Sequence, residues 1–207
     1  WSSNLVATLL SQAQAPVVAD MSSDIFSRQL DFDRMALIYA GAQKNMGPAG
    51  TTLVVINKSV LTKKDSFIPT VLNYAKQIEA ESMLNTPSVY AVYVSLLTLK
   101  WIEAQGLGSI EKQNNEKAQL LYKTIDDSTV FSGTVAVEDR SQMNVCFKTT
   151  DAETDAKFLA FAEANDLQGL AGYRTVGGFR ASIYNAMPLA GVQKLVACMK
   201  QFESQYK

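Results

Sequence analysis

A lysine and an aspartate in the first quarter of the sequence are the residues best suited to chemistry. Asp20 ends one short apolar run, and Lys44 follows another, 24 positions later, in a segment with three glycines. Such a segment can hold a lysine amine close to the carbonyl carbon of a cofactor, and a carboxylate can keep a pyridine nitrogen protonated. The pair therefore predicts a site for pyridoxal 5'-phosphate (PLP), with Lys44 as the catalytic residue.

Each of these residues also has an ordinary structural explanation. A lone lysine in a loop is usually a solvated surface charge, and Asp20 could cap the turn formed by Ser22 or Ser23. The sequence contains no histidine, which excludes Ser-His-Asp and Cys-His nucleophiles and imidazole metal ligands within this chain. We expect no metal site, and chemistry must use lysine, aspartate, arginine, tyrosine or a cofactor.

The composition is that of an ordinary globular protein with a small-molecule partner. Of 207 residues, 47% are hydrophobic, and 19 basic residues against 20 acidic ones give a formal net charge of −1. Because neither charge forms a long run, we expect neither nucleic acid nor a membrane as a partner. No apolar stretch is long enough to span a bilayer and no leader pattern is present, so we expect a cytoplasmic location.

Three apolar runs, at residues 16–20, 36–40 and 52–56, predict buried strands of an α/β fold. Too few residues separate the second run from the third for a helical crossover, so we expect these two strands to pair antiparallel in a mixed, mostly parallel sheet. From Pro87 to Gly106, apolar residues recur at three- and four-residue spacing and predict a long, buried helix.

The glycines around residue 107 mark the expected domain boundary. Residues 1–107 would form one domain and residues 108–207 a small α+β domain. The elements expected in the second domain are a polar helix at 109–125, strands at 130–137 and 143–147, a helix at 151–165 and a final helix after Pro188.

Four ordered segments resemble the phosphoserine aminotransferase family of class V PLP enzymes. They are VADMSSD at 18–24, IYAGAQKNMGPAG at 38–50, SMLNTP at 82–87 and RTVGGFRASIYNA at 174–186. The first two look like the family's cofactor signature, the third like its phosphate loop and the fourth like its substrate-arginine segment. The resemblance implies a PLP-dependent transferase of fold type I, with residues 1–107 as the C-terminal part of its large PLP-binding domain.

The same resemblance implies how the cofactor is bound. Asp20 would pair with the pyridinium nitrogen, Gln43 would contact the cofactor phosphate, and Lys44 would hold the aldehyde and later move the proton. Asn85 and Thr86 would bind the phosphate of the cofactor in the partner subunit. The active site would therefore belong to a homodimer.

For the substrate, the resemblance implies two arginines and a neighbouring ring. Arg180 would bind the α-carboxylate, and Arg174 the phosphate, because guanidinium binds such groups in two-point fashion. Most relatives carry a histidine where this chain has Tyr173, which can donate a hydrogen bond but adds no charge. Taken alone, the arginines could be surface residues, and Thr86 and Pro87 could simply start a helix as N-cap and first helical residue.

The implied reaction is a transamination of serine biosynthesis. Glutamate gives its amino group to 3-phosphohydroxypyruvate, and the products are 2-oxoglutarate and O-phosphoserine. The analogous reaction of 4-phosphohydroxythreonine in pyridoxine biosynthesis is a further possibility. Two alternatives stay open, namely another class V PLP enzyme with a different substrate and a non-catalytic truncated domain. The match covers only the C-terminal part of a family member, so we expect the isolated chain to be inactive or nearly so.

Overall fold

The computed structural model describes residues 12–61 and 68–206. The chain forms two compact units. The N-terminal unit extends to Phe26 and resumes over Leu30–Ala104, and the C-terminal unit contains Ser27–Gln29 and the chain from Gln105 onward. Gln105 lies close to the boundary expected at residue 107, and the assignment of these units as domains stays a prediction. No helix in the described ranges is long and apolar enough to cross a membrane.

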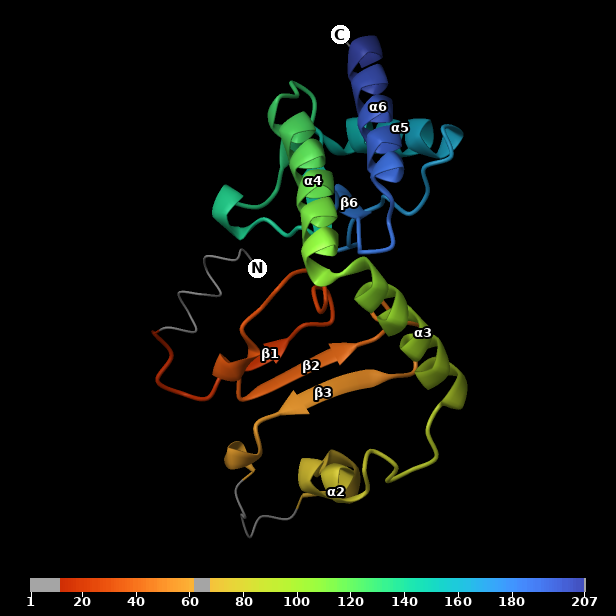
Figure 1. Cartoon of the computed structure of the whole chain (residues 1–207). Helices are drawn as coiled ribbons and strands as arrows, with labels where there is room; N and C mark the ends of the chain where they lie inside the picture. The colour runs from red at the N-terminus through yellow and green to blue at the C-terminus, as the bar shows by residue number, and fades with distance from the viewer. Residues whose placement is uncertain (1–11, 62–67, 207) are drawn as a thin grey trace. The chain divides into compact units, whose positions relative to one another are not determined.

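A mixed three-stranded sheet forms the centre of the N-terminal unit (Figure 1). Its strands are β1 (Val18–Asp20), β2 (Leu37–Gly41) and β3 (Thr52–Ile56). β1 runs parallel to β2, and β2 runs antiparallel to β3, as expected from the short connection. One face of the sheet packs into a small core whose buried members are Met21, Ile25, Met35, Ile38, Ala40, Ala42 and Met46.

Burial in this unit departs from the sequence prediction. β1 was expected to be a buried strand, but Val18 is 61% exposed. The helix α3 (Val89–Gln105) was expected to be buried, and the buried residues on it are Ala91, Ser95 and Ile102. Its exposed apolar side chains are Val89, Tyr90, Val92, Tyr93, Leu96, Leu97 and Trp101. The prediction of burial was wrong. A helix that is apolar all round is buried only if other elements pack on every side of it, and the described residues cover only the side of Ala91, Ser95 and Ile102.

The start of α3 corrects a second expectation. Thr86 and Pro87 were considered as N-cap and first helical residue. The backbone N–H of Val92 instead donates to the carbonyl of Ser88, at 3.0 Å, and the helix begins at Val89. The sequence also gave no sign of four short elements, η1 (Phe32–Arg34), η2 (Lys58–Val60), η3 (Thr70–Leu72) and α2 (Tyr74–Glu79).

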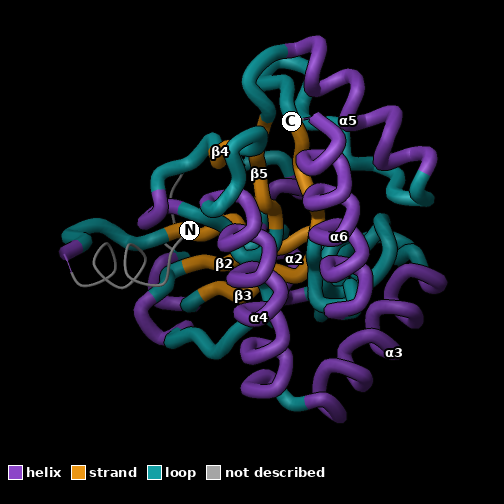
Figure 2. The backbone as a smooth tube through the Cα atoms, turned by 90° about the horizontal axis from the view of Figure 1, so that it is seen from above, coloured by secondary structure: helices purple, strands orange, loops and turns teal. Residues whose placement is uncertain are grey.

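The C-terminal unit has the expected α+β composition. An antiparallel sheet of β4 (Ser132–Gly133), β5 (Asn144–Lys148) and β6 (Phe179–Ser182) accompanies α4 (Leu107–Asp126), α5 (Ala152–Ala164), α6 (Leu189–Tyr206) and the short η4 (Val137–Asp139). Helices α4 and α6 lie side by side (Figure 2). The core contains a cluster of rings in mutual edge and tilted contact, formed by Phe131, Phe147, Phe158, Phe179 and Phe202.

Two features of this sheet differ from the prediction. A strand over 130–137 was expected, but only Ser132 and Gly133 pair with β5. The side chains of Val135 and Val137 are 40% and 71% exposed, so the apolar run has no single buried face to hold it in a sheet. β6 was not predicted, although it carries Arg180.

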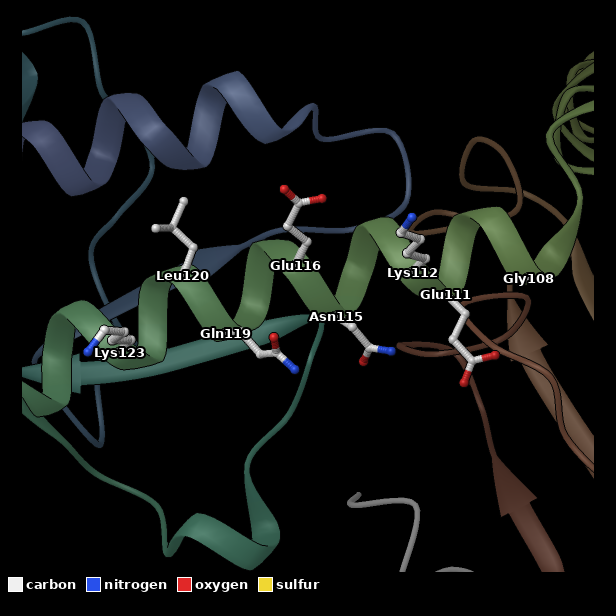
Figure 3. A pocket seen from close by; sticks show the side chains of 8 residues that line it. All are labelled: Gly108, Glu111, Lys112, Asn115, Glu116, Gln119, Leu120 and Lys123. Carbon is white, nitrogen blue, oxygen red and sulfur yellow. The ribbon is translucent and has the colours of Figure 1, made fainter.

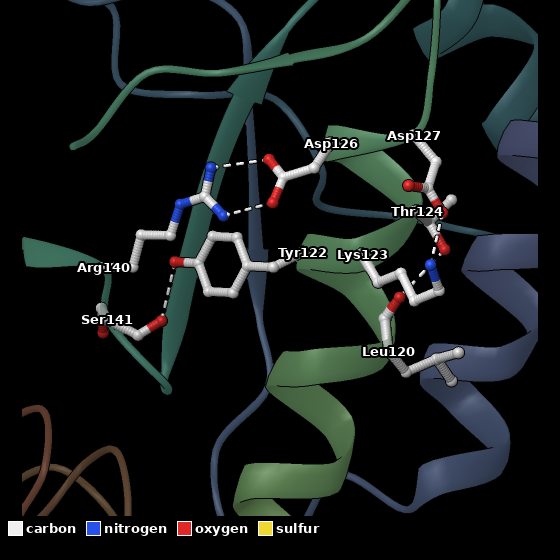
Figure 4. A network of polar contacts seen from close by, with 8 residues as sticks. All are labelled: Leu120, Tyr122, Lys123, Thr124, Asp126, Asp127, Arg140 and Ser141. Atoms are coloured by element: carbon white, nitrogen blue, oxygen red, sulfur yellow. Dashed lines mark hydrogen bonds and ion pairs between the residues drawn. The ribbon is translucent and has the colours of Figure 1, made fainter. Parts of the chain in front are cut away.

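A fork-shaped ion pair attaches the segment after η4 to the end of α4 (Figure 4). The two terminal nitrogens of Arg140 donate to the two carboxylate oxygens of Asp126, each at 2.7 Å. The guanidinium also lies 4.6 Å from the ring centroid of Tyr122, whose hydroxyl donates to the carbonyl of Ser141 at 2.8 Å. Burial raises the pKa of Tyr122 to about 12. Bidentate geometry and the ring contact fix the arginine more firmly than a single exposed pair would.

The most unusual polar group in this unit is a buried lysine on α4. Lys117 is 1% exposed, and its Nζ donates to the carbonyls of Ile183 at 3.0 Å, Tyr184 at 2.8 Å and Met187 at 3.0 Å. One turn earlier, Nδ2 of Asn114 donates to Oδ1 of Asn185. These bonds attach the segment that follows β6 to α4. Burial lowers the pKa of Lys117 to about 8.

We predict that Lys117 makes the stability of this protein depend on pH between about 8 and its ordinary pKa of 10.5. In that interval the folded chain binds fewer protons than the unfolded chain, so the free energy of unfolding that Lys117 contributes rises with pH. The rise should reach up to about 3 kcal/mol.

Urea unfolding of the wild type and Lys117→Met, measured from pH 7 to pH 10.5, checks this prediction. The free energy of unfolding of the wild type minus that of Lys117→Met should rise with pH across the interval. Lys123→Met is the matched control, since Lys123 lies on the same helix and is 76% exposed. A difference that stays constant with pH contradicts the prediction.

Candidate active site

The turn after β1 holds the Asp20 carboxylate. The backbone N–H of Ser22 donates to Oδ1 of Asp20 at 2.9 Å. The pKa of Asp20 is lowered, chiefly by this backbone bond and then by the Ser22 hydroxyl. The capping role considered for Asp20 is therefore present. A carboxylate has about four acceptor positions, so the capping bond leaves room for a ligand.

The neighbouring strand places Tyr39 beside Asp20. The two residues are partners in the parallel register of β1 and β2, so their side chains share one face of the sheet. A hydrogen bond from Tyr39 further lowers the pKa of Asp20. The negative charge of Asp20 is in turn the main cause that raises the pKa of Tyr39.

Lys44 is not a freely solvated surface charge. Its side chain lies in the turn that follows β2 and is half-buried, and its Nζ donates to Oγ of Ser23 at 2.7 Å. The positive charge of Lys44 is a further cause of the lowered pKa of Asp20. The amine and the carboxylate therefore lie within electrostatic range of each other at one edge of the sheet.

Two more bonds join the turn after β1 to the turn after β2. The N–H of Gly41 donates to Oγ of Ser22 at 3.0 Å. Asn45 is 4% exposed, and its Nδ2 donates to the carbonyl of Ile25 at 3.1 Å and to that of Ser23 at 3.4 Å. The two turns thus form one hydrogen-bonded assembly that positions the candidate cofactor residues.

The sequence analysis did not identify Ser22, Ser23, Tyr39 or Asn45 as site residues. Two signals could have found some of them. Tandem hydroxyl side chains directly after a strand-end carboxylate can each bond a different group in the turn. Parallel pairing of the first two strands would have placed Tyr39 beside Asp20.

The glycines around Lys44 serve the packing of α3. A Cβ atom on Gly47 would overlap Ser95 and lie 3.0 Å from its Cα atom. Gly50 has a φ of 114°, and a Cβ there would lie 3.2 Å from the side chain of Ala91. We expected these glycines to allow a ligand to approach the backbone. In the structure, close contact with α3 accounts for Gly47, and a positive φ together with such a contact accounts for Gly50.

The expected phosphate ligands are exposed. The side chain of Gln43 lies against Gly41. Asn85 and Thr86 are exposed in the segment that precedes α3, and Nδ2 of Asn85 donates to the carbonyl of Thr86 at 3.1 Å. Their role in binding a phosphate stays a prediction.

The residues expected to bind substrate lie in the C-terminal unit. Arg180 is on β6, and its guanidinium carbon lies 5.9 Å from the ring centroid of Tyr173. The Nε atom of Arg180 is buried and has no hydrogen-bond partner among the described residues. Arg174 and Tyr173 are exposed in a tight turn that the bond from the N–H of Gly172 to the carbonyl of Gly178 closes, at 2.9 Å.

One surface hollow of the C-terminal unit contains none of the predicted site residues. It has a volume of about 780 Å³ and is lined by side chains of α4 alone (Figure 3). These side chains point to different sides of the helix, so they offer no convergent set of polar groups for a ligand. Among the described residues, no group of three or more Cys, Asp or Glu side chains could hold a metal ion.

Comparison with known proteins identifies the relatives of this chain. The family model described as aminotransferase class-V matches residues 3–195. The phosphoserine aminotransferase of Flavobacterium johnsoniae is 60% identical over 191 residues, which are 92% of this chain and 54% of that protein. The enzyme of the same name from Flavobacterium psychrophilum is 53% identical over 94% of this chain and 55% of its own length. The chain spans about half the length of the curated relatives it matches.

Solved structures give the same result for the fold. The phosphoserine aminotransferase from Bacillus circulans subsp. alkalophilus superimposes with a TM-score of 0.90 at 39% identity, over 95% of this chain and 55% of that one. A PLP-bound phosphoserine aminotransferase from Trichomonas vaginalis gives 0.86 at 38% identity, over 91% and 55%. The expected fold class, an α/β PLP-dependent transferase of fold type I in part, is confirmed.

We predict that Ser22→Ala raises the pKa of the Asp20 carboxyl toward its ordinary value. The hydroxyl is the second largest cause of the lowered pKa, and its loss leaves the backbone N–H of Ser22 in place. A pH titration followed by ¹³C NMR of the Asp20 carboxyl carbon measures the change. Tyr39→Phe should give a smaller rise, and an unchanged titration in Ser22→Ala contradicts the prediction.

Proposed function

The chain belongs to the class-V aminotransferase family, and from this premise we propose that it is part of a phosphoserine aminotransferase that uses PLP. The proposed reaction transfers an amino group between glutamate and 3-phosphohydroxypyruvate, giving 2-oxoglutarate and O-phosphoserine in serine biosynthesis. The observation that carries the proposal is the Lys44 amine, held on Ser23 within electrostatic range of the Asp20 carboxylate.

The side chains at this edge of the sheet fit the proposed cofactor. A pyridine nitrogen stays protonated beside an ionised carboxylate, and the bonds from Ser22 and Tyr39 favour the ionised form of Asp20. Lys44 supplies a primary amine, the group that attaches an aldehyde covalently. Because the donor set matches the cofactor at both positions, PLP is the cofactor that these residues favour.

In the proposed mechanism, PLP supplies an aldehyde and a ring that accepts electrons when a proton leaves the substrate. Asp20 holds the proton on the pyridine nitrogen. Gln43 binds the cofactor phosphate. With the cofactor bound, the Lys44 amine would hold the aldehyde and would then be the group that moves the proton of the substrate's α-carbon.

We propose that three residues of the C-terminal unit bind the substrate. Arg180 binds the α-carboxylate, and its buried Nε, which has no hydrogen-bond partner in the described part of the chain, supports this role. Arg174 binds the substrate phosphate, and Tyr173 donates a hydrogen bond to the same phosphate. A guanidinium suits both tasks because it stays charged and presents paired donors.

The proposed partner is a second copy of this chain. The apolar side chains of α3 are exposed over much of the helix, including Tyr90 at 75% and Tyr93 at 58%. A contiguous exposed apolar face of this kind favours a protein interface. Asn85 and Thr86 directly precede α3, which supports their proposed binding of the partner's cofactor phosphate. A cytoplasmic location stays a prediction.

A second candidate, left open by the sequence analysis, is a truncated domain that does no chemistry. The chain covers 54% of the relative from Flavobacterium johnsoniae. The two candidates differ in whether this chain forms a covalent bond with PLP through Lys44.

We predict that incubation with PLP followed by borohydride reduction labels Lys44, and that Lys44→Ala abolishes this label. Mass spectrometry of the digested chain measures it. Lys58→Ala is the matched control, because Lys58 is an exposed lysine in the same unit, and the label on Lys44 should persist there. Turnover of the isolated chain should be absent or nearly so. If Lys44 takes no label, the catalytic proposal fails for this chain.

We predict a preference for phosphorylated ligand that depends on Tyr173 and Arg174. In the PLP-loaded chain, calorimetry should find O-phosphoserine bound more tightly than serine, by at least about ten-fold for a charge-assisted contact. Replacing both residues, by Phe and Ala, should abolish the difference, and the exposed control Arg34→Ala should preserve it. Equal binding of the two ligands by the wild type would favour a class V enzyme with another substrate.

A further inference from the structure

We propose that Ser23 is a positioning residue for the Lys44 amine. Its hydroxyl fixes the direction in which the free amine points before it forms a bond with the cofactor. This inference rests on the proposed function, because it assigns a purpose to Ser23 within the same site. The sequence analysis placed Ser23 only in the turn that Asp20 could cap, and neither it nor the family resemblance gave Ser23 a role toward Lys44.

The geometry of the contact is the first argument. Nζ of Lys44 donates to Oγ of Ser23 at 2.7 Å, and both residues are half-buried. The bond joins residues 21 positions apart, so it depends on the pairing of β1 with β2 and not on local chain geometry. It is the short, tertiary type of hydrogen bond that fixes a flexible side chain.

The rigidity of the turn around Ser23 is the second argument. The buried amide of Asn45 donates to the carbonyls of Ser23 and Ile25. Ile25 is 2% exposed within the core of the N-terminal unit. Asn45 follows Lys44 directly, so its bonds to the turn of Ser23 also hold the backbone of Lys44 against that turn. The hydroxyl that accepts and the lysine that donates are therefore both fixed in place.

The division of work between the two serines is the third argument. Ser22 bonds Asp20 and Gly41, whereas Ser23 bonds Lys44. One turn therefore sets the carboxylate expected at the pyridine nitrogen and the amine expected at the aldehyde. A ligand that touches both groups needs this relative placement to within a fraction of an ångström.

The chemistry of an amine explains why a hydroxyl suits this position. A lysine side chain has four rotatable bonds and loses up to about 2 kcal/mol of conformational entropy when it is fixed. A neutral amine has two N–H bonds and one lone pair, so giving one N–H to Ser23 restricts where the lone pair points. A hydroxyl oxygen accepts from the charged and the neutral amine alike, so the contact can persist when the amine changes its proton count.

The first test measures the order of the Lys44 side chain in the chain without cofactor. ¹³C relaxation of the Lys44 Cε atom reports its motion on the picosecond to nanosecond scale. We expect Ser23→Ala to lower the order parameter by roughly half, and Ser23→Thr to restore it because it keeps the hydroxyl. Ser59→Ala, an exposed serine in η2 of the same unit, is the matched control and should have no effect.

The second test measures the rate at which PLP attaches to Lys44, trapped by borohydride at successive times and quantified by mass spectrometry. The loss of one hydrogen bond should slow attachment roughly five-fold in Ser23→Ala. Ser23→Thr should return the rate to that of the wild type, which a general loss of folding would not explain.

The outcomes separate this inference from the proposed function. An unchanged order parameter in Ser23→Ala overturns the positioning role, and so does an unchanged attachment rate in a chain that does take PLP. If the wild type takes no PLP while the order parameter falls in Ser23→Ala and recovers in Ser23→Thr, the positioning role holds and the proposed function fails for this chain.

Discussion

The parallel pairing of β1 with β2 is the constraint on which the candidate site depends. It aligns Asp20 with Tyr39 and brings the turn after β1 against the turn after β2. The bonds from Gly41, Lys44 and Asn45 to that first turn are possible only in this register. A slip by one residue would move the Asp20 side chain to the opposite face of the sheet and separate it from Tyr39. The position of the lysine amine relative to the carboxylate is therefore a consequence of sheet pairing.

Packing of α3 against the Lys44 segment provides a second constraint. Gly47 and Gly50 lie where any side chain would press on Ser95 or Ala91. The segment can therefore lie this close to the helix only with glycine at both positions. The opposite sides of the same helix expose tyrosine, leucine and tryptophan side chains. One helix thus combines a close contact that shapes the candidate site with an apolar surface suited to a partner. The same helix follows the segment proposed to bind the partner's cofactor phosphate.

The C-terminal unit achieves rigidity by other means. Rings packed edge to face fill its core, while α4 fixes two irregular segments through polar bonds, one through Arg140 and one through Lys117. The second of these segments directly follows β6, the strand that carries Arg180. A buried lysine with three carbonyl partners is costly to desolvate and gains much of that cost back from its hydrogen bonds. The arrangement suits a unit in which Arg180 is proposed to bind the substrate.

The sequence by itself determined the class of the fold, the three strands of the first unit and their mixed pairing, the four long helices, and Asp20 and Lys44 as the candidate cofactor residues. These follow from local periodicity, short connections and motif spacing, which act over neighbouring residues. Only the tertiary structure decided which faces are exposed, where β6 lies, why Gly47 and Gly50 are glycines, and that Ser23 accepts from Lys44. Such features depend on contacts between residues far apart in the chain, and the hydrophobic pattern of one segment does not contain its partner.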